Sequence, residues 1–307
     1  MNYNTGTVLI ECLESLYKTE NKDFFEVIVV DNNSSDNSKE IVEAFKSDKN
    51  NFKSIYLEKL ESFSFANNRG FEISAGEYIL ILNPDIIFTE PVLSKLVNNL
   101  EVNKNIGAIS LMLRGTDGKF QSNYFQRYPS LFQFVMFYSF FMRLFSWSKF
   151  LLNRYLENDD IEKSKDEIFY VPQIPGAFFL TRRKIFVEVG MMDEGYKLFY
   201  EDVDLSYQIN KKYKLAVNTS FSIIHLGGSS FQTDENWWQY SRYIMSLNLF
   251  FDKNYNIFRR LFLKFLSVSN SVLVIVLEFV KKPFGKQNQY RYKKHINFLK
   301  DLFNYYF

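Results

Sequence analysis

Cysteine and histidine are scarce in this 307-residue chain, and no uncharged apolar run is long enough to cross a lipid bilayer. Cys12 is the only cysteine, so no disulfide can form within the chain. It shares the apolar face of a helical pattern with Leu9 and Leu13, which favours a small buried hydrophobe over a reactive thiol. The N-terminus lacks the basic-then-apolar pattern of a signal peptide. These absences predict a protein that stays in the cytoplasm.

Basic residues are concentrated at the end of the chain, although the formal net charge is only +2. Residues 281–307 hold seven Lys and Arg against Asp301 alone, which leaves 30 basic and 34 acidic groups in residues 1–280. A neutral-to-acidic body with a basic end suits an anionic membrane surface better than a nucleic-acid duplex. We therefore expect a membrane-surface partner and no nucleic acid.

Two uncharged apolar runs fall short of the roughly 20 residues that a membrane-spanning helix needs. Leu131–Met142 is rich in aromatic residues and is predicted to be an interfacial or a buried helix. Phe265–Leu277 follows Arg259 and Arg260 and precedes the basic end of the chain. This arrangement predicts an in-plane membrane anchor.

The first 110 or so residues alternate two kinds of segment, apolar runs bounded by turn residues and amphipathic helical patterns. The predicted strands are Val27–Val30, Ile55–Leu57, Tyr78–Leu82 and Ile106–Leu111, and the predicted helices are Thr7–Leu16, Asp36–Phe45, Phe65–Ser74 and Pro91–Leu100. Such alternation indicates a parallel sheet with helices on both faces, whose ligands bind beyond the carboxyl ends of the strands. The loops after Val30 and Leu82 are therefore candidate sites. Strand-like and helix-like segments resume over 171–228, and the rest of the chain is predicted to be helical.

Two polar loops follow predicted strands. Asp31 ends the first strand, and its loop leads into a helix whose unpaired N–H groups suit an anion. Its carboxylate could accept hydrogen bonds from a base or a ribose, although such residues also form ordinary turns. Asp85, in Asn83-Pro84-Asp85, could hold a divalent cation that bridges a diphosphate, and a plain turn is the other interpretation.

An acidic cluster and a histidine follow later in the chain. Glu201-Asp202-Val203-Asp204 is either a solvated helix start or the source of a general base, and its periodicity fits both a strand and a helix. His225 ends an apolar run before two glycines that permit close backbone approach to a ligand, although most lone histidines are structural. His295, in the basic tail, is predicted to be solvated.

Eight motifs, in order, resemble the family 2 glycosyltransferases, in particular the rhamnosyltransferase-like branch that builds bacterial surface polysaccharides. The match covers roughly residues 2–250 and consists of Asn2-Tyr3-Asn4, Val30–Asp36, Ala66–Gly70, Leu82–Asp85, Arg127–Ser130, Pro175–Phe178, Glu201–Leu205 and His225–Gly228.

The resemblance implies an α/β fold of the GT-A type, with a mixed, mostly parallel sheet, flanking helices and a C-terminal helical segment. The implied parts are a nucleotide-sugar-binding half (1–117), a helical insertion (118–170), an acceptor-binding half with the catalytic base (171–253) and a basic, membrane-peripheral tail (254–307). Relatives begin with a strand before the Tyr-Asn motif, and this strand is expected to be missing here. The first regular element is then the helix near Thr7.

The resemblance also implies roles for residues that would contact the donor nucleotide. Asp31 would contact its pyrimidine base. Asn67 occupies a slot where many relatives carry an arginine near the nucleotide, and Arg69 is close by. Tyr3 and Asn83 belong to motifs that would bind the same ligand.

Further implied roles concern the metal and the chemistry. Asn83-Pro84-Asp85 stands where many relatives have Asp-x-Asp, so Asp85 and His225 are the implied ligands of a divalent cation, Mn²⁺ or Mg²⁺. Asp202 matches the catalytic base, with Glu201 beside it at the substrate. Gly176 and Ala177 resemble the floor under the transferred sugar.

The implied reaction is a single displacement with inversion, from a dTDP- or UDP-sugar, with rhamnose as one donor sugar, to a glycan or polyprenyl-linked acceptor. The enzyme would work at the inner face of the cell membrane.

Other functions are also compatible with parts of the sequence. Gln239-Tyr240-Ser241-Arg242-Tyr243 resembles the Gln-x-x-Arg-Trp motif of processive polysaccharide synthases, although those enzymes carry several membrane spans. A nucleotidyltransferase would need a Gly-rich basic phosphate loop, whereas residues 31–38 are acidic and free of glycine. A catalytically inactive sugar-nucleotide-binding or scaffold protein is the non-enzyme alternative.

Overall fold

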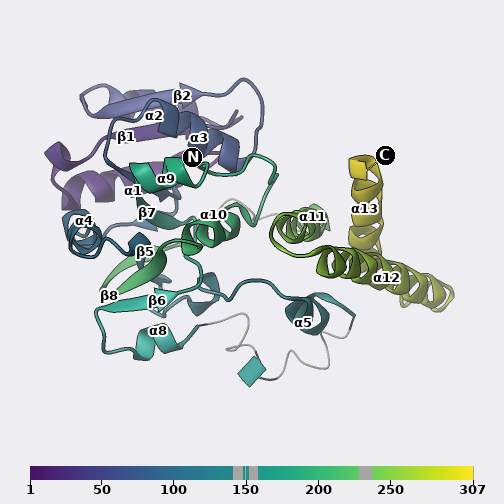
Figure 1. Cartoon of the computed structure of the whole chain (residues 1–307). Coiled ribbons are helices and arrows are strands. Elements are labelled where there is room, and N and C mark those ends of the chain that lie inside the picture. The colour runs from purple at the N-terminus through teal and green to yellow at the C-terminus, as the bar shows by residue number, and fades with distance from the viewer. Residues whose placement is uncertain (141–147, 149, 152–157, 228–236, 307) are drawn as a thin grey trace. The chain divides into compact units, whose positions relative to one another are not determined.

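A computed structural model describes residues 1–140, 148, 150–151, 158–227 and 237–306 of the chain (Figure 1). The chain divides into two compact units. The first comprises residues 1–128, 156–195 and 201–232, and the second comprises residues 129–155, 196–200 and 233–307. Every residue with a predicted role in the site falls in the first unit.

The first unit alternates helices and strands in the predicted order. Its first part consists of α1 (Gly6–Thr19), η1 (Lys22–Phe24), β1 (Val27–Asp31), α2 (Ser38–Lys46), β2 (Phe52–Tyr56), α3 (Phe63–Glu72), β3 (Tyr78–Leu82), β4 (Ile86–Ile87), α4 (Leu93–Val102) and β5 (Ile106–Arg114). All four predicted strands and all four predicted helices are confirmed, with ends moved by at most three residues. Its second part consists of η2 (Ser122–Tyr124), α8 (Asp160–Lys163), β6 (Ile168–Val171), β7 (Phe178–Arg182), α9 (Arg183–Glu188), α10 (Glu201–Asn210) and β8 (Lys214–His225).

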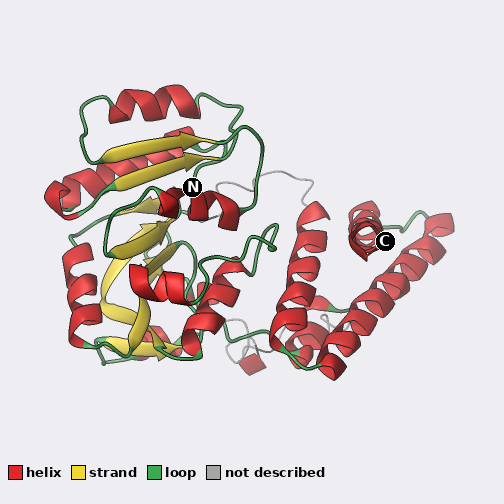
Figure 2. Ribbon diagram, turned by 45° about the horizontal axis from the view of Figure 1, so that its top comes forward, coloured by secondary structure: helices red, strands yellow, loops and turns green. Residues whose placement is uncertain are grey.

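The strands form two sheets. β1 and β2 pair in parallel, and a six-stranded sheet has the order β3-β7-β5-β8-β4, with β6 also paired to β8. β5 and β8 are parallel, and the other pairs in that sheet are antiparallel. α2 and α3 pack on the smaller sheet, and α4, α9 and α10 pack on the larger one (Figure 2). The predicted GT-A-type mixed α/β fold is confirmed.

The region before α1 contains a single bridge in place of a strand. Asn2 lies beside Asp31 in a parallel bridge: its N–H donates to Val30 O, and its own O accepts from Asn32 N–H, both at 2.8 Å. Among the described residues, the first regular element is therefore α1, as predicted.

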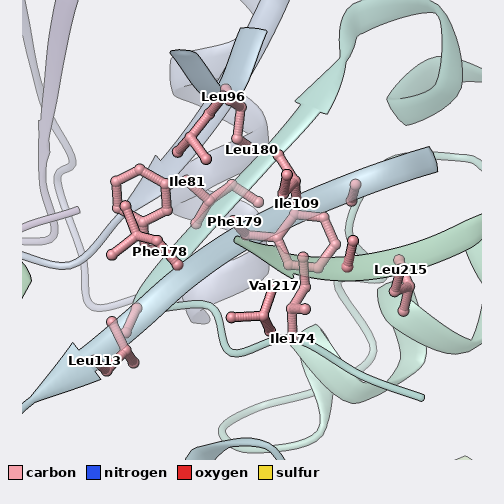
Figure 3. Close-up of a cluster of buried hydrophobic side chains, with 14 of the residues drawn as sticks. Ile81, Leu96, Ile109, Leu113, Ile174, Phe178, Phe179, Leu180, Leu215 and Val217 are labelled. Carbon is pink, nitrogen blue, oxygen red and sulfur yellow. The ribbon is translucent and has the colours of Figure 1, made fainter. Parts of the chain in front are cut away.

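The core lies between the larger sheet and its helices. Residues 106–113 of β5 are buried on both faces of the sheet, which explains why that strand is a continuous apolar run. Figure 3 shows Ile109 of β5 packed among Phe179 of β7 and Val217 of β8. Cys12 belongs to this cluster with 1% of its surface exposed, and burial raises the pKa of its thiol to about 12. The prediction that Cys12 is a small buried hydrophobe is confirmed.

The acidic cluster that fitted two periodicities is helical. α10 begins at Glu201 and buries Leu205 and Ile209, which are one helical turn apart, against β5 and β8. The strand-like alternation of Val203, Leu205 and Tyr207 therefore has no structural counterpart.

The regular elements in the described residues of the second unit are helices, as predicted for the chain after residue 228. It contains α5 (Leu131–Gln133), the π-helical turn η3 (Phe134–Tyr138), α11 (Trp237–Asn254), α12 (Ile257–Lys281), η5 (Lys282–Phe284) and α13 (Gln289–Tyr306). Phe134, Met136 and Phe137 are buried, which supports the core-helix interpretation of the run that starts at Leu131. The last two residues of that run, 141 and 142, lie outside the described residues.

Two predictions in this unit are wrong, the insufficient length of the Phe265–Leu277 run and the exposure of His295. The run lies within a helical stretch, Ile257–Phe284, whose 28 residues are long and apolar enough to cross a membrane by length and composition alone. The in-plane membrane anchor stays a prediction. His295 is buried, with its Nδ1 3.0 Å from Ser271 Oγ. Burial, with Lys294 and Arg291 nearby, lowers the pKa of His295 to about 3. It is not solvated because it lies on the face of α13 that packs on α12.

Candidate active site

Asp31 is held rigidly at the carboxyl end of β1. Its Oδ1 accepts from Ser34 N–H at 2.9 Å, and its Oδ2 accepts from Ser34 Oγ and Asn2 Nδ2, both at 2.7 Å. The side chain is buried, so these donors replace the water that a carboxylate otherwise requires. Asp31 presents a fixed acceptor at the edge where the sequence predicts the base or ribose.

Two asparagines before α1 shape the same loop. Asn4 has a left-handed backbone (φ 52°), and its Oδ1 accepts from Ser35 N–H at 2.7 Å. Its N–H donates to Ser34 Oγ at 2.9 Å. Tyr3, between Asn2 and Asn4 in the sequence, is half-buried. The sequence predicts that Tyr3 contacts the donor nucleotide, and this stays a prediction. The described hydrogen bonds that order the loop come from Asn2 and Asn4.

The α3 residues have contacts of a different kind from those expected. Asn67 Nδ2 donates within the helix to Phe63 O at 2.8 Å. Arg69 forms ion pairs with Glu72 (2.8 Å) and Glu194 (3.5 Å). The predicted nucleotide contacts of Asn67 and Arg69 stay predictions.

Asp85 and His225 lie side by side. β4 follows Asp85 directly and pairs with the end of β8, so that Ile86 stands opposite His225. Leu226 N–H donates to Asp85 O at 2.9 Å, and His225 Nε2 lies 3.5 Å from Asp85 Oδ1. Both side chains are at least nine-tenths buried. The structure thus brings together the two residues predicted as metal ligands. Of the two glycines that follow His225 in the motif, Gly228 lies outside the described residues.

Asp202 is fixed at the start of α10 by two backbone donors. Gly176 N–H donates to Asp202 Oδ2 and Val203 N–H donates to Asp202 Oδ1, both at 2.8 Å. A Cβ on Gly176 would lie 3.5 Å from Oδ2, so the absence of a side chain there keeps space beside the carboxylate. Phe199 and Tyr200, just before the helix, both have left-handed backbones (φ 67° and 70°). Such strain at bulky residues costs roughly 1–3 kcal/mol each and is found mostly at functional sites.

The two neighbouring carboxyl groups have raised pKa values. Burial raises the pKa of Asp202, and the hydrogen bonds from Gly176 and Val203 oppose that shift. Burial, followed by the charge of Asp202, raises the pKa of Glu201 to about 8. Glu201 Oε2 has no hydrogen-bond partner among the described residues. Near neutral pH, therefore, Asp202 is the better candidate for the ionised group and Glu201 for the protonated one.

These two pairs are linked through backbone beyond the end of β3. Asn83 N–H donates to Ala177 O at 3.0 Å. Ala177 follows Gly176, which bonds Asp202, and Asn83 precedes the Asp85–His225 pair by two residues. Asp31 shares no hydrogen bond or ion pair with either pair in the part of the chain that the structure describes.

The Asp85–His225 pair is the one suited to a divalent cation. In the described ranges, no three His, Cys, Asp or Glu side chains are close enough together to hold a metal ion. One carboxylate and one imidazole, however, are acceptable Mn²⁺ ligands when a diphosphate supplies further oxygens. The residues therefore fit a cation that is shared with a phosphate ligand.

The fold is that of GT-A enzymes in solved structures. A mannosyltransferase from Pyrobaculum calidifontis aligns over 98% of this chain and 72% of its own length, at 15% identity and a TM-score of 0.56. Staphylococcus aureus TarS aligns over 83% of this chain and 64% of its own, at 16% identity and a TM-score of 0.54.

The sequence identifies the family. Residues 1–190 match the model of glycosyl transferase family 2, and the chain belongs to this family. Glycosyltransferase GlyG of Streptococcus pneumoniae serotype 4 is 35% identical over 99 residues, which are 32% of this chain and 33% of GlyG. The poly-beta-1,6-N-acetyl-D-glucosamine synthase of Staphylococcus epidermidis is 27% identical over 108 residues, or 26% of its length. This chain thus aligns with a third or less of each relative. The rhamnosyltransferase-like branch stays a prediction.

Proposed function

We propose that this chain is an inverting glycosyltransferase that moves a sugar from a nucleotide-diphosphate donor to a glycan or lipid-linked glycan in surface polysaccharide synthesis. The observation that carries the proposal is the fixed Asp202 carboxylate, bonded to Gly176 and linked through Ala177 and Asn83 to the Asp85–His225 pair. Family membership and the synthase relative support the same reaction class.

In the proposed reaction Asp202 is the general base. The acceptor hydroxyl passes its proton to Asp202 as its oxygen forms a bond to the anomeric carbon, and the bond from that carbon to the diphosphate breaks. Attack from the face opposite the leaving group inverts the configuration. Burial raises the pKa of Asp202, which increases its basicity.

Glu201 supports this division of roles. Because its pKa is about 8, it keeps its proton at neutral pH and can donate a hydrogen bond to the substrate. If Glu201 were ionised as well, its negative charge would hold the proton on Asp202 and hinder the later release of that proton to solvent.

The donor and the cation are proposed by analogy with GT-A structures. The mannosyltransferase is described in complex with GDP-Man and Mn²⁺, and TarS in complex with UDP. In this chain Asp85 and His225 would hold a divalent cation. When bound, that cation would neutralise charge that develops on the departing diphosphate. Asp31 would contact the base, with dTDP and UDP as the proposed nucleotides and rhamnose as one proposed sugar.

A membrane-peripheral position at the inner face of the membrane is also proposed. On α12, the buried residues are the apolar Leu263 and Val274 and four polar ones, Ser267, Asn270, Ser271 and Glu278. The outward face carries apolar side chains such as Phe265 and Phe279, which are 64% and 63% exposed. Apolar side chains exposed in this way are unusual on a surface helix of a water-soluble protein.

A donor-turnover assay tests the enzymatic proposal. The full chain is incubated with Mn²⁺ and a panel of dTDP-, UDP- and GDP-sugars, and the release of nucleoside diphosphate is measured. At least one donor should be turned over, and NMR of the first sugar formed should give the anomer opposite to that of the donor. Retention of configuration in the product would contradict the proposal. Donor binding without turnover, in every sample that contains an acceptor, would contradict it as well.

A further inference from the structure

The two ring nitrogens of His225 have different neighbours. Nδ1 lies 2.7 Å from Gln121 Oε1, and Nε2 lies 3.5 Å from Asp85 Oδ1. The edge of the ring also packs against Tyr124, with ring centroids 4.7 Å apart. The imidazole is therefore oriented by groups on one side and faces a carboxylate on the other.

The amide of Gln121 is oriented by a second hydrogen bond. Its Nε2 donates to the backbone O of His225 at 3.0 Å. With the nitrogen committed to that carbonyl, the oxygen Oε1 must face Nδ1. An amide oxygen can only accept, so Nδ1 must carry the proton.

A short turn holds Gln121 in this place. Gln121 N–H donates to Leu113 O at 2.9 Å, and Arg114 and Phe120 form an antiparallel bridge. The turn between them is closed by Gly115 N–H, which donates to Lys119 O at 2.9 Å. Because β5 and β8 are neighbours, this turn places Gln121 at the end of β8.

With its proton on Nδ1, the imidazole directs Nε2 at the Asp85 carboxylate, 3.5 Å from Oδ1. In this tautomer Nε2 and the carboxylate can share a positive charge that lies between them. The other tautomer would donate a hydrogen bond from Nε2 to Asp85 and would occupy the position that a metal needs.

We propose that Gln121 is a positioning residue that fixes the Nδ1–H tautomer of His225 and thereby keeps Nε2 available for a divalent cation shared with Asp85. The cation is that of the proposed function, so the inference rests on it in part. The tautomer itself is a property of the metal-free protein, and it can be tested separately.

The first test reads the tautomer by nitrogen-15 NMR of histidine-labelled full-length protein without metal, at about pH 8. The chain has only two histidines, so each ring can be assigned with a single His295→Gln variant. His225 should show a protonated Nδ1. An unprotonated Nδ1 in the wild-type protein would overturn the proposal.

Substitution of Gln121 should change this spectrum. Gln121→Met removes the acceptor, so His225 should switch to the Nε2–H form that donates to Asp85. Gln126→Met is the matched control, because Gln126 Nε2 donates to Asn123 O and the change should leave His225 unaffected. Should Gln121→Met not fold, Gln121→Asn keeps an amide with a shorter reach and should give the same switch. An unchanged spectrum in whichever variant folds would contradict the proposal.

The second test measures Mn²⁺ binding by calorimetry with UDP or dTDP present, because Asp85 and His225 alone supply too few ligands to hold the ion tightly. Loss of the group that orients a histidine ligand typically weakens metal binding about 10–100-fold, and Gln121→Met should show a loss of this size. Equal affinity of wild type and Gln121→Met would overturn the role of Gln121. If the wild-type protein binds no Mn²⁺, the metal in the proposed function is wrong, and the tautomer spectrum decides the role of Gln121.

Discussion

Glu201 and Asp202 are adjacent carboxyl groups with different surroundings. Asp202 accepts from two backbone N–H groups, whereas Glu201 Oε2 has no hydrogen-bond partner among the described residues. Hydrogen bonds favour the ionised form and burial without them favours the neutral form. The difference assigns the negative charge to Asp202 and the proton to Glu201, which is the arrangement that a general base requires.

Asp202→Asn should therefore abolish the proposed proton transfer without disturbing the fold, because Asn keeps an oxygen for the Gly176 N–H. We expect kcat for sugar transfer to fall by about 10²–10⁴-fold. Asp204→Asn is the matched control on the same helix, since Asp204 accepts from Gln208 and its amide counterpart still can. Rates would be measured at saturating donor. A large loss with Asp204→Asn and none with Asp202→Asn would show that Asp202 is not the base.

Glu201 should make both stability and activity depend on pH. A carboxyl group whose folded pKa is raised from 4.5 to about 8 contributes stability below about pH 4.5, and this contribution is lost as the pH rises through 8. In Glu201→Gln the fall in melting temperature between these values should be smaller. The variant should transfer sugar at neutral pH and keep its activity above pH 8, where the wild-type rate declines. Parallel pH profiles of the two proteins would rule out this role.

At the scale of elements, α12 buries several polar side chains and exposes several apolar ones. Glu278 is buried and bonded to Lys281 and Asn288, and His295 of α13 reaches Ser271. Such contacts satisfy polar groups within the unit and leave the aromatic and aliphatic side chains to face a medium that tolerates them. Lipid is such a medium, and the basic residues at both ends of the helix suit anionic headgroups.

Phe265→Ser combined with Phe279→Ser should weaken binding to vesicles of phosphatidylcholine and phosphatidylglycerol by at least about tenfold, because each exposed phenyl ring loses apolar burial in the bilayer. Phe24→Ser, a change at an exposed phenylalanine of the first unit, is the control and should bind like the wild type. Co-sedimentation measures the bound fraction. An alkaline carbonate wash should release the protein, and resistance to it would indicate a spanning helix instead of a peripheral one.

The helices and strands of the first unit could be predicted because their apolar periodicities are strong. α10 could not be assigned from its period alone, since Leu205 fits both a strand and a helix, and packing against β5 and β8 decided between them. His295 was misjudged because a basic tail suggests a solvated surface. The burial of that ring depends on a partner helix 24 residues away, which no local pattern reveals.

At the scale of the whole molecule, the site could be predicted only as a set of separate motifs. Asp85 and His225 are paired because β4 returns to the end of β8, and Asp202 meets Gly176 because α10 packs beside β7's entry loop. Gln121 carries no sequence signal at all, since it is an ordinary polar residue in a turn, 104 positions from the histidine that it contacts. A residue that contacts a motif from a distant position in the sequence can be identified only from the three-dimensional structure.

The division into two units gives a prediction about the whole chain. All the predicted donor-binding residues lie in the first unit, so a nucleoside diphosphate with Mn²⁺ should stabilise that unit and leave the other unchanged. Ligand at 100 times its dissociation constant adds about 2.7 kcal/mol to the unit that binds it, which shifts its melting temperature upward by several degrees.

Calorimetry of the full chain with UDP or dTDP and Mn²⁺ would measure this shift, since two units can melt in separate transitions. Asp85→Asn should reduce the shift, because it removes a proposed cation ligand, whereas Asp160→Asn, at a surface position 77% exposed, should not. The shift should require both Mn²⁺ and the nucleotide, because Asp85 and His225 alone supply too few ligands to hold the ion tightly. A shift confined to the second unit, or one that Asp85→Asn leaves unchanged, would place the nucleotide elsewhere in the chain.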